Sequence, residues 1–474
     1  MPIRFMSPPQ KRRYNLCFPM TFPATQGMQR AGEPVSLYYT RNQMYTLILI
    51  CFLAGYLLIA LESVTKVDKG GIALITCTAC WILLGMTMSH QALASSFTAH
   101  LAECSQTILF LMAAMIVVEL LDSCGSFRFV AWHMRTHSAR RLLWKTAALT
   151  FCLSAVLDNM TTSILMVTIL RNLVSDRNER VRLACIVVLA ANAGGAFSPI
   201  GDVTTIMLWI GGYISGMGVI KGLLLPSIAC VLAPTLIMSF RTHGKVSEPV
   251  GTGLGEDSPL TNRQRKMALA IGVGGLTLTP LFHNLTGLPP FVGVMAVMAV
   301  LWVAVEIFAY SVRRRQAKPI NVGMLCRRID LPTILFFLGI LLTVGALKET
   351  GMLELAGNRL DTWVGNVYAV NGIIGAVSSV IDNVPLVASA MSMYSIDATG
   401  SLSAYCQDGA FWELLAYCAG TGGSLLIIGS AAGVVVMGIE RISFVWYLKH
   451  FTWLALVGYL CGMTIYWLQQ NLAL

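Results

Sequence analysis

The chain has 474 residues, of which 56% are hydrophobic and only 12% are charged, whereas a soluble domain carries about 25% charged residues. This composition excludes an ordinary soluble protein and indicates a polytopic membrane protein, because the length allows ten or more apolar spans of roughly 20 residues each. The net charge of +10 would suggest nucleic-acid binding in a soluble protein. Here the basic residues fall mainly in loops between apolar segments, where they set membrane topology, so we expect no nucleic-acid partner.

Cysteine spacing and sequence motifs give no sign of a metal centre or an enzyme. The thirteen cysteines are scattered, and the one close pair, Cys77 and Cys80, lies in an apolar run. In such a run, small residues favour helix packing over metal or redox chemistry. The sequence also has no His/Glu metal spacing, no nucleophile elbow and no phosphate-binding loop. We therefore expect no cofactor and no enzymatic activity.

The chain begins with a basic segment and continues as a series of apolar segments. Residues 1–43 hold no apolar run long enough to span a membrane or to form a signal-peptide core, so we expect a disordered or surface-lying tail. Twelve apolar segments follow. They cover residues 44–62, 71–89, 102–121, 142–172, 181–212, 218–240, 267–283, 290–311, 332–348, 366–397, 409–439 and 448–471.

Two of these segments carry the same acidic pair near the middle. Asp158-Asn159 interrupts residues 142–172, and Asp382-Asn383 interrupts residues 366–397. Helix-weakening residues follow each pair, so each segment is predicted to be a re-entrant hairpin of two half-helices that meet at a polar tip. A tip that stops partway through a membrane leaves backbone groups unpaired, which is tolerated only where the tip lines a cavity or is buried in protein.

The segment after each hairpin is also interrupted. Residues 191–202, which read ANAGGAFSPIGD, break the segment 181–212, and residues 420–430, which read GTGGSLLIIGS, break the segment 409–439. When the two are superposed, the Gly-Gly and Ile-Gly pairs match, and Asp202 falls opposite Ser430. Paired Gly/Pro-interrupted segments in two halves of a chain indicate the binding site of a transporter.

These correspondences predict the fold class. We expect an all-α polytopic membrane protein with two inverted-topology repeats, about ten transmembrane helices, two re-entrant hairpins and two broken helices. The basic N-terminal tail would cover residues 1–43, the first repeat 44–240, a cytoplasmic linker 241–266 and the second repeat 267–474.

Basic loops suggest the orientation of the chain. Arginine and lysine gather in residues 128–141, 241–266 and 313–328, and such loops normally face the cytoplasm. The first hairpin would then enter from inside and the second from outside. The cost of this orientation is a basic N-terminal tail on the outer side, unless the chain crosses the membrane once more near its start.

The predicted tips and breaks bring together the oxygen ligands that a small cation prefers. Asp158 and Asp382 would supply charge and hard oxygen atoms to Na+. A buried carboxylate beside another carboxylate favours its protonated form, so a proton and a metal cation can compete for the same group. Neutral oxygen donors are expected from Asn159, Thr161, Thr162, Asn192, Ser198, Asn383, Thr421 and Ser424.

Plainer interpretations stay open for the acidic residues. An Asp-Asn pair can simply cap a helix N-terminus, although its duplication at matching places argues for more than that. Asp202 is either a third acidic ligand or the N-cap of the half-helix that begins near Val203. The fold could also serve an anion transporter for a di- or tricarboxylate, arsenite or sulfate.

Three motifs resemble a known family. They are Leu157 to Thr162 (LDNMTT), Ala191 to Thr205 (ANAGGAFSPIGDVTT) and Asp382 to Leu386 (DNVPL), and they are similar to those of NhaD-type sodium/proton antiporters of the ion transporter superfamily. Relatives that carry dicarboxylates have Ser-Asn-Thr at the hairpin tips, whereas this chain has Asp-Asn.

The resemblance covers about residues 44–471. It implies an inverted-repeat fold, a homodimer in membrane lipid and elevator-like movement of a transport domain. We therefore expect an antiporter that exchanges Na+ or Li+ for H+, located in a bacterial inner membrane, with Asp158 and Asp382 alternately protonated and bound to Na+.

Overall fold

The computed structural model describes residues 35–60, 65, 67–246, 260–313, 329–397 and 403–472. The described part is built from α-helices, and its isolated pairing of extended backbone joins Ser138 to Lys245. The predicted all-α class is therefore confirmed. Most of the predicted tail and part of the predicted linker lie outside the described residues.

The helices of the first half of the chain follow the apolar segments closely. They are α1 (Val35–Ala60), α3 (Lys69–Gly85), α4 (His90–Ser123), α5 (Arg128–Met134), α6 (Ala139–Ser154), α7 (Asn159–Leu173), α8 (Arg177–Ala196), α9 (Val203–Ile210) and α10 (Gly216–Arg241).

The second half continues in a similar order. Its helices are α11 (Asn262–Thr286), α12 (Pro290–Arg313), α14 (Leu331–Glu349), α15 (Met352–Val364), α16 (Val367–Ser378), α17 (Asn383–Met393), α18 (Ala410–Gly422), α19 (Ala431–Glu440), α20 (Phe444–His450) and α21 (Thr452–Leu472).

All four predicted interruptions are present. Each Asp-Asn pair separates two helices, α6 from α7 and α16 from α17, and the Asn is the first residue of the second helix. The glycine-rich stretches separate α8 from α9 and α18 from α19. The helices on the two sides of an interruption pack against each other in three cases, α6 with α7, α8 with α9 and α16 with α17. Helices α18 and α19 are not among the closely packed pairs. That these helix pairs are re-entrant hairpins stays a prediction.

Some boundaries differ from those expected. Helix α1 begins at Val35, so the last residues of the predicted tail are helical. Helix α4 begins at His90, where the Ser89 side chain accepts a hydrogen bond from Ala92 N, although the apolar segment identified in the sequence starts only at Ala102. Hydropathy detects only the apolar part of a helix, so a polar first turn with a good N-cap escapes it.

Five helices of the described part are long and apolar enough to cross a membrane, namely α4, α10, α11, α12 and α14. A sixth crossing results if α19 and α20, which meet at 109°, form one span. Because several predicted spans are broken into shorter helices, the expected number of about ten transmembrane helices stays a prediction.

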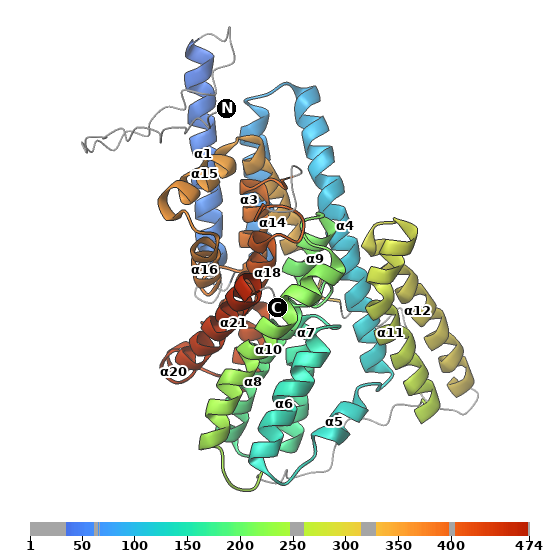
Figure 1. Cartoon of the computed structure of the whole chain (residues 1–474). Coiled ribbons are helices and arrows are strands. Elements are labelled where there is room, and N and C mark those ends of the chain that lie inside the picture. The colour runs from blue at the N-terminus through green and yellow to red at the C-terminus, as the bar shows by residue number, and fades with distance from the viewer. Residues whose placement is uncertain are drawn as a thin grey trace, which may run out of the picture.

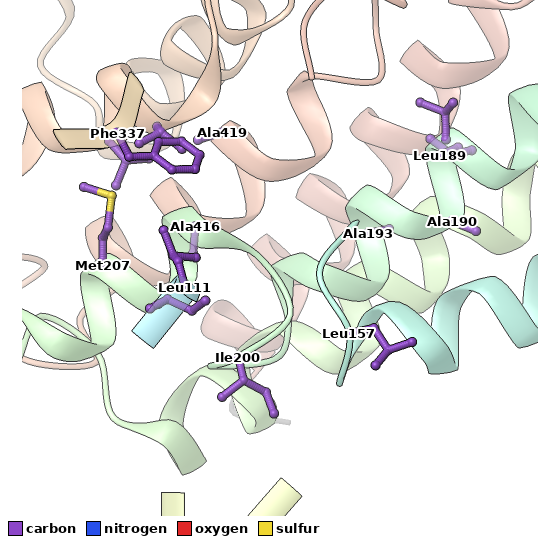
Figure 2. Packing of buried hydrophobic residues seen from close by; sticks show 14 of the residues in the cluster. Leu111, Leu157, Leu189, Ala190, Ala193, Ile200, Met207, Phe337, Ala416 and Ala419 are labelled. Carbon is purple, nitrogen blue, oxygen red and sulfur yellow. The ribbon is translucent and has the colours of Figure 1, made fainter. Parts of the chain in front are cut away.

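The centre of the molecule lies around α8 and α18. Every α8 residue from Leu183 to Ala196 is buried, as is every α18 residue from Phe411 to Gly422, and a helix buried all round is a core helix. These two helices contact each other. Figure 2 shows Ala193 of α8, Ala416 and Ala419 of α18, and Leu157 and Ile200 from the two breaks of the first half.

Contacts between the halves are reciprocal. Helix α7 of the first half packs on α19 of the second, and α17 of the second half packs on α9 of the first. Helices α3 and α14 form another close pair. Helices α11 and α12 lie side by side at one edge, against α4 (Figure 1). Because the helices that follow the four breaks pack against one another across the halves, the breaks lie close together in the interior, away from the edge that α11 and α12 form.

Candidate functional site

A buried carboxylate receives hydrogen bonds from both halves of the chain. Asp202 Oδ2 accepts from Asn159 Nδ2 and from Asn383 Nδ2, each at 3.3 Å. The Asp202 residue is 1% exposed, and the two asparagines are 6% and 5% exposed. The first residue of α7 and the first residue of α17 therefore donate to the same oxygen atom, which belongs to the residue that precedes α9.

Asn192 extends this cluster toward the second broken helix. Its Oδ1 accepts from Asn159 Nδ2 at 3.1 Å, and its Nδ2 donates to Ser424 Oγ at 2.8 Å and to Ser430 Oγ at 2.9 Å. Asn192 and Ser424 are fully buried. We call these residues the polar cluster, which consists of Asn159, Asn192, Asp202, Asn383, Ser424 and Ser430.

Helix capping explains why the chain breaks where it does. Asp158, Asp202 and Ser430 are the N-caps of α7, α9 and α19, and their side chains accept hydrogen bonds from Thr161 N, Thr204 N and Gly433 N. Asp382 has the N-cap position of α17 but makes no side-chain capping bond. Asp202 is thus the N-cap of α9 through Oδ1, while its Oδ2 accepts from two asparagines. That Asp202 is also an acidic ion ligand stays a prediction.

Glycines at matching positions let the backbone fold tightly around the cluster. A Cβ atom added to Gly195 would lie 2.7 Å from Gly201 O and 3.1 Å from Asp202 Cβ. A Cβ added to Gly423 would lie 2.9 Å from both Gly429 O and Ser430 Cβ. The two broken helices, which correspond in sequence, thus also correspond in structure. Each glycine lies against a glycine carbonyl oxygen and the Cβ atom of the following N-cap residue.

The two aspartates at the predicted tips make different bonds. Asp158 Oδ1 accepts from Thr161 N at 2.8 Å, and Asp158 Oδ2 accepts from Thr161 Oγ1. Asp382 Oδ2 lies 3.2 Å from Lys69 Nζ of α3. Each aspartate is adjacent in sequence to an asparagine of the polar cluster, but neither carboxylate makes a hydrogen bond to Asp202.

The remaining four predicted donors make no hydrogen bond to the polar cluster. Ser198 Oγ and Thr421 Oγ1 donate to the backbone carbonyls of Ala155 and Tyr417. Thr162 is fully buried, and its hydroxyl has no hydrogen-bond partner within the described structure. Thr161 is held by Asp158. The predicted site residues therefore fall into a central set, the members of the polar cluster, and a surrounding set whose side chains bond other groups or none.

Two cavities border opposite ends of α17. The first has a volume of about 370 Å³ and is lined by Asp382 and Pro385, together with Lys69, Asp330 and Ser430. The second has a volume of about 340 Å³ and is lined by Met391 and Ser392 near the other end of α17 and by residues of α4, α9 and α14. The first cavity reaches the polar cluster at Ser430.

Sequence reasoning did not include Lys69 or Ser430 in the predicted site. A lysine at the start of an apolar segment is usually a topology signal, so nothing in the sequence distinguished Lys69. The sequence marks Ser430 as the counterpart of Asp202, and that correspondence is the signal that indicates a place in the site.

Comparisons with known proteins place the chain in a transporter family. Residues 56–405 match a family model described as citrate transporter. Sodium/proton antiporter 2 of Arabidopsis thaliana is 39% identical over 431 residues, which cover 90% of this chain and 100% of that protein. The Na(+)/H(+) antiporter NhaD of Vibrio cholerae is 30% identical, with 92% of this chain and 94% of that protein covered. This chain belongs to the NhaD-type sodium/proton antiporter family.

Membership makes this NhaD-type chain an integral membrane protein of a transporter family rather than an enzyme. The resemblance that the three motifs suggested is confirmed. A solved structure, the YdaH transporter of Alcanivorax borkumensis, is similar in fold, with a TM-score of 0.55 and 12% identity over 86% of this chain and 99% of that chain. Because two similar relatives are plant proteins, the expected bacterial inner membrane stays a prediction.

Proposed function

We propose that this NhaD-type protein exchanges Na+ or Li+ for H+ across a membrane, and that the polar cluster is where the two ions compete. The observation that carries this proposal is the buried Asp202 carboxylate, which accepts hydrogen bonds from Asn159 and Asn383 of opposite halves. The names of the relatives, sodium/proton antiporters from a plant and from bacteria, support the same exchange.

Electrostatics explain why such a cluster would exchange one ion for the other. A carboxylate that is 1% exposed has little water to stabilise its charge, and an uncompensated buried charge is strongly unfavourable. Either H+ or Na+ neutralises it. Since one charge is enough, binding of either ion excludes the other, and this competition is the simplest basis of antiport.

The neutral groups of the cluster suit a small cation. Asparagine carries both an amide nitrogen and a carbonyl oxygen, so rotation of the amides of Asn159, Asn192 and Asn383 would turn oxygen atoms toward a bound Na+. The hydroxyl oxygens of Ser424 and Ser430 add two further donors within hydrogen-bonding distance of Asn192. Hard oxygen ligands of this kind fit Na+ and Li+ better than a soft metal.

Asp158 and Asp382 belong to the proposal as carboxylates that flank the cluster. Each precedes an asparagine that donates to Asp202, so protonation or cation binding at either would move the adjacent donor. Four further hydroxyl groups would support the ion-bound state of the polar cluster from the helix turns and breaks that surround it. They belong to Thr161, Thr162, Ser198 and Thr421. In this proposal, Asp158 and Asp382 alternate between a protonated and a Na+-bound state.

The proposed fold is an inverted repeat that works by elevator-like movement. The reciprocal packing of α7 on α19 and of α17 on α9 supports it, as do the matching glycine contacts of Gly195 and Gly423. The two cavities at opposite ends of α17 are suited to access from opposite faces. A homodimer in the membrane, with repeats over 44–240 and 267–474, completes the proposal.

Everted membrane vesicles with a pH-sensitive dye test the exchange. Addition of Na+ or Li+ to vesicles acidified inside should release protons and restore fluorescence in the wild type, and Asp202→Asn should abolish that response. Asp176→Asn is the matched control, because Asp176 caps the exposed start of α8 and lies outside the cluster. A wild type that gives no cation-dependent response, or an Asp202→Asn variant that transports normally, would overturn the proposal.

Anion transport is the second candidate function. The matching family model is described as citrate transporter, and the N-termini of α7, α9, α17 and α19, whose partial positive charge favours anions, begin next to the cluster. Three of these four N-termini are preceded directly by an aspartate, whose negative charge opposes an anion. Uptake of labelled citrate in the same vesicles, with no proton release by Na+, would favour this candidate instead.

A further inference from the structure

Lys69 holds its ammonium group between a carboxylate and an aromatic ring. Lys69 Nζ lies 3.2 Å from Asp382 Oδ2, and the two side chains are 23% and 15% exposed. The same Nζ lies 4.4 Å from the centroid of the Phe336 ring on α14, and Phe336 is fully buried. The face of an aromatic ring attracts a cation, so the ammonium has two sites of attraction within reach of one lysine side chain.

The position of Lys69 in its own helix does not explain this arrangement. Lys69 is the first residue of α3, where the positive end of the helix dipole repels a cation. Asp68 already caps this end, since its Oδ1 accepts from Gly70 N at 2.7 Å. The lysine is therefore held there by groups on other helices, and Asp382 at the start of α17 supplies the opposite charge.

The surrounding cavity is suited to admitting a cation. Three acidic residues, Asp68, Asp330 and Asp382, line it together with one basic residue, Lys69. A cavity with excess negative charge raises the local concentration of cations. Ser430 also lines this cavity, and it accepts a hydrogen bond from Asn192. A cation that enters thus meets Asp382 and Lys69 at the same place where the polar cluster becomes accessible.

We propose that Lys69 is a tethered cation that occupies Asp382 in the absence of Na+, and that an entering Na+ must displace it. This inference rests on the proposed Na+/H+ exchange. Lys69 stays protonated throughout and moves its ammonium toward Phe336, while Asp382 stays balanced by one positive charge or the other. Because a tethered group competes at a high and fixed local concentration, Lys69 sets the apparent affinity for Na+ as a positioning residue.

Variants of Lys69 test this competition through the Na+ concentration that gives half the maximal response in vesicles. Lys69→Met and Lys69→Gln remove the tethered cation and should lower that concentration about fivefold, as expected for loss of a partly buried ion pair. Lys69→Arg keeps the charge and should remain close to the wild type. Lys221→Met is the matched control, because Lys221 is exposed on α10 and does not line the cavity.

A second measurement uses purified protein and does not depend on transport. Na+ should raise the midpoint of thermal unfolding at lower concentrations in Lys69→Met than in the wild type, because ligand that binds the folded state stabilises it. In the Asp382→Asn background, Lys69→Met should produce no further shift. Size-exclusion chromatography shows whether each variant is folded, and Lys69→Gln replaces Lys69→Met if the latter aggregates.

The outcomes distinguish this inference from the function on which it rests. Vesicles of the wild type without cation-dependent proton release would overturn the exchange and the role of Lys69 together. Exchange in the wild type with unchanged half-maximal Na+ concentrations in Lys69→Met and Lys69→Gln would overturn the role of Lys69 alone. A lower maximal rate without a change in that concentration would show a merely structural role and would likewise overturn it.

Discussion

Asn159 and Asn383 donate to the same oxygen atom, Asp202 Oδ2, from distances of 3.3 Å each. They are the first residues of α7 and α17, which belong to opposite halves of the chain. Equivalent asparagines of the two halves therefore donate to one residue that has no acidic equivalent. The counterpart of Asp202 in the other broken helix is Ser430, which is neutral. Two like donors with one acidic acceptor make a site with a single charge at its centre.

The Asp202→Ser substitution tests the negative charge of Asp202 separately from the capping of helix α9. Serine is a good N-cap and has that position in α19, so the variant should fold and change the free energy of unfolding by less than ~1 kcal/mol. Na+-dependent proton release should nevertheless fall to the background of empty vesicles, because the polar cluster then has no carboxylate for H+ and Na+ to share. Thermal unfolding and vesicle fluorescence measure the two effects separately.

Ser430→Ala is the control for that experiment. It removes the cap of α19 and the bond from Asn192 but leaves the carboxylate, so it should lower stability by about 1 kcal/mol. Exchange should be retained, with a higher half-maximal Na+ concentration because one proposed oxygen donor is lost. Retained activity in Asp202→Ser together with loss in Ser430→Ala would contradict a central role for Asp202.

Local rules were enough to predict the breaks. Asp158 and Asp382 interrupt apolar runs at positions where an aspartate favours a helix start, and the Gly-Gly pairs mark the places where the backbone is tight. The structure has a helix start at Asn159 and another at Asn383. These features depend on residues close together in sequence, so periodicity, caps and glycines suffice to find them.

Long-range pairings could not be obtained in the same way. The sequence pointed to Asp158 and Asp382 as the central carboxylates, while the structure puts Asp202 at the hydrogen-bonded centre and pairs Asp382 with Lys69. Lys69 and Asp382 are 313 positions apart. The local sequence around Lys69 or Asp382 does not predict which distant side chain each of them contacts, because that contact depends on how the helices pack.

Gly195→Ala and Gly423→Ala should destabilise the protein by similar amounts, because each added methyl group would press on a backbone carbonyl at a matching position. Those contacts, 2.7 Å to Gly201 O and 2.9 Å to Gly429 O, are too short for carbon and oxygen, and overpacking typically costs ~1–3 kcal/mol. Thermal unfolding of purified protein measures the loss. Gly438→Ala is the control, since a Cβ there meets nothing within 4 Å, and it should be neutral or slightly stabilising.

Ser154→Ala and Ser378→Ala should also have matching effects. Ser154 Oγ donates to Ala191 O at 2.6 Å, and Ser378 Oγ donates to Ala419 O at 2.8 Å. Both serines are fully buried, and each joins the helix before an Asp-Asn pair to a central helix. Loss of one such bond within a membrane protein should lower the free energy of unfolding by ~0.6–1.5 kcal/mol. Clearly unequal losses would contradict structural equivalence of the two positions.

Glu440 ties the end of α19 to α8 and should be the most sensitive stabilising carboxylate outside the polar cluster. Its side chain is 1% exposed and accepts from Arg180 Nε at 3.0 Å through both oxygens, while Arg171 Nε lies 3.6 Å away. Removing one partner of a buried ion pair leaves the other charge uncompensated, which typically costs ~3–5 kcal/mol.

Glu440→Gln should therefore lower thermal stability strongly, whereas Glu354→Gln, at an exposed position in the first turn of α15, should not. In Arg180→Ala, the further change Glu440→Gln should cost much less than it does in the wild type, since its main partner is already gone. Equal costs in both backgrounds would show that the pair contributes nothing, and the link between the halves would then rest on apolar packing of α7 and α8 against α19.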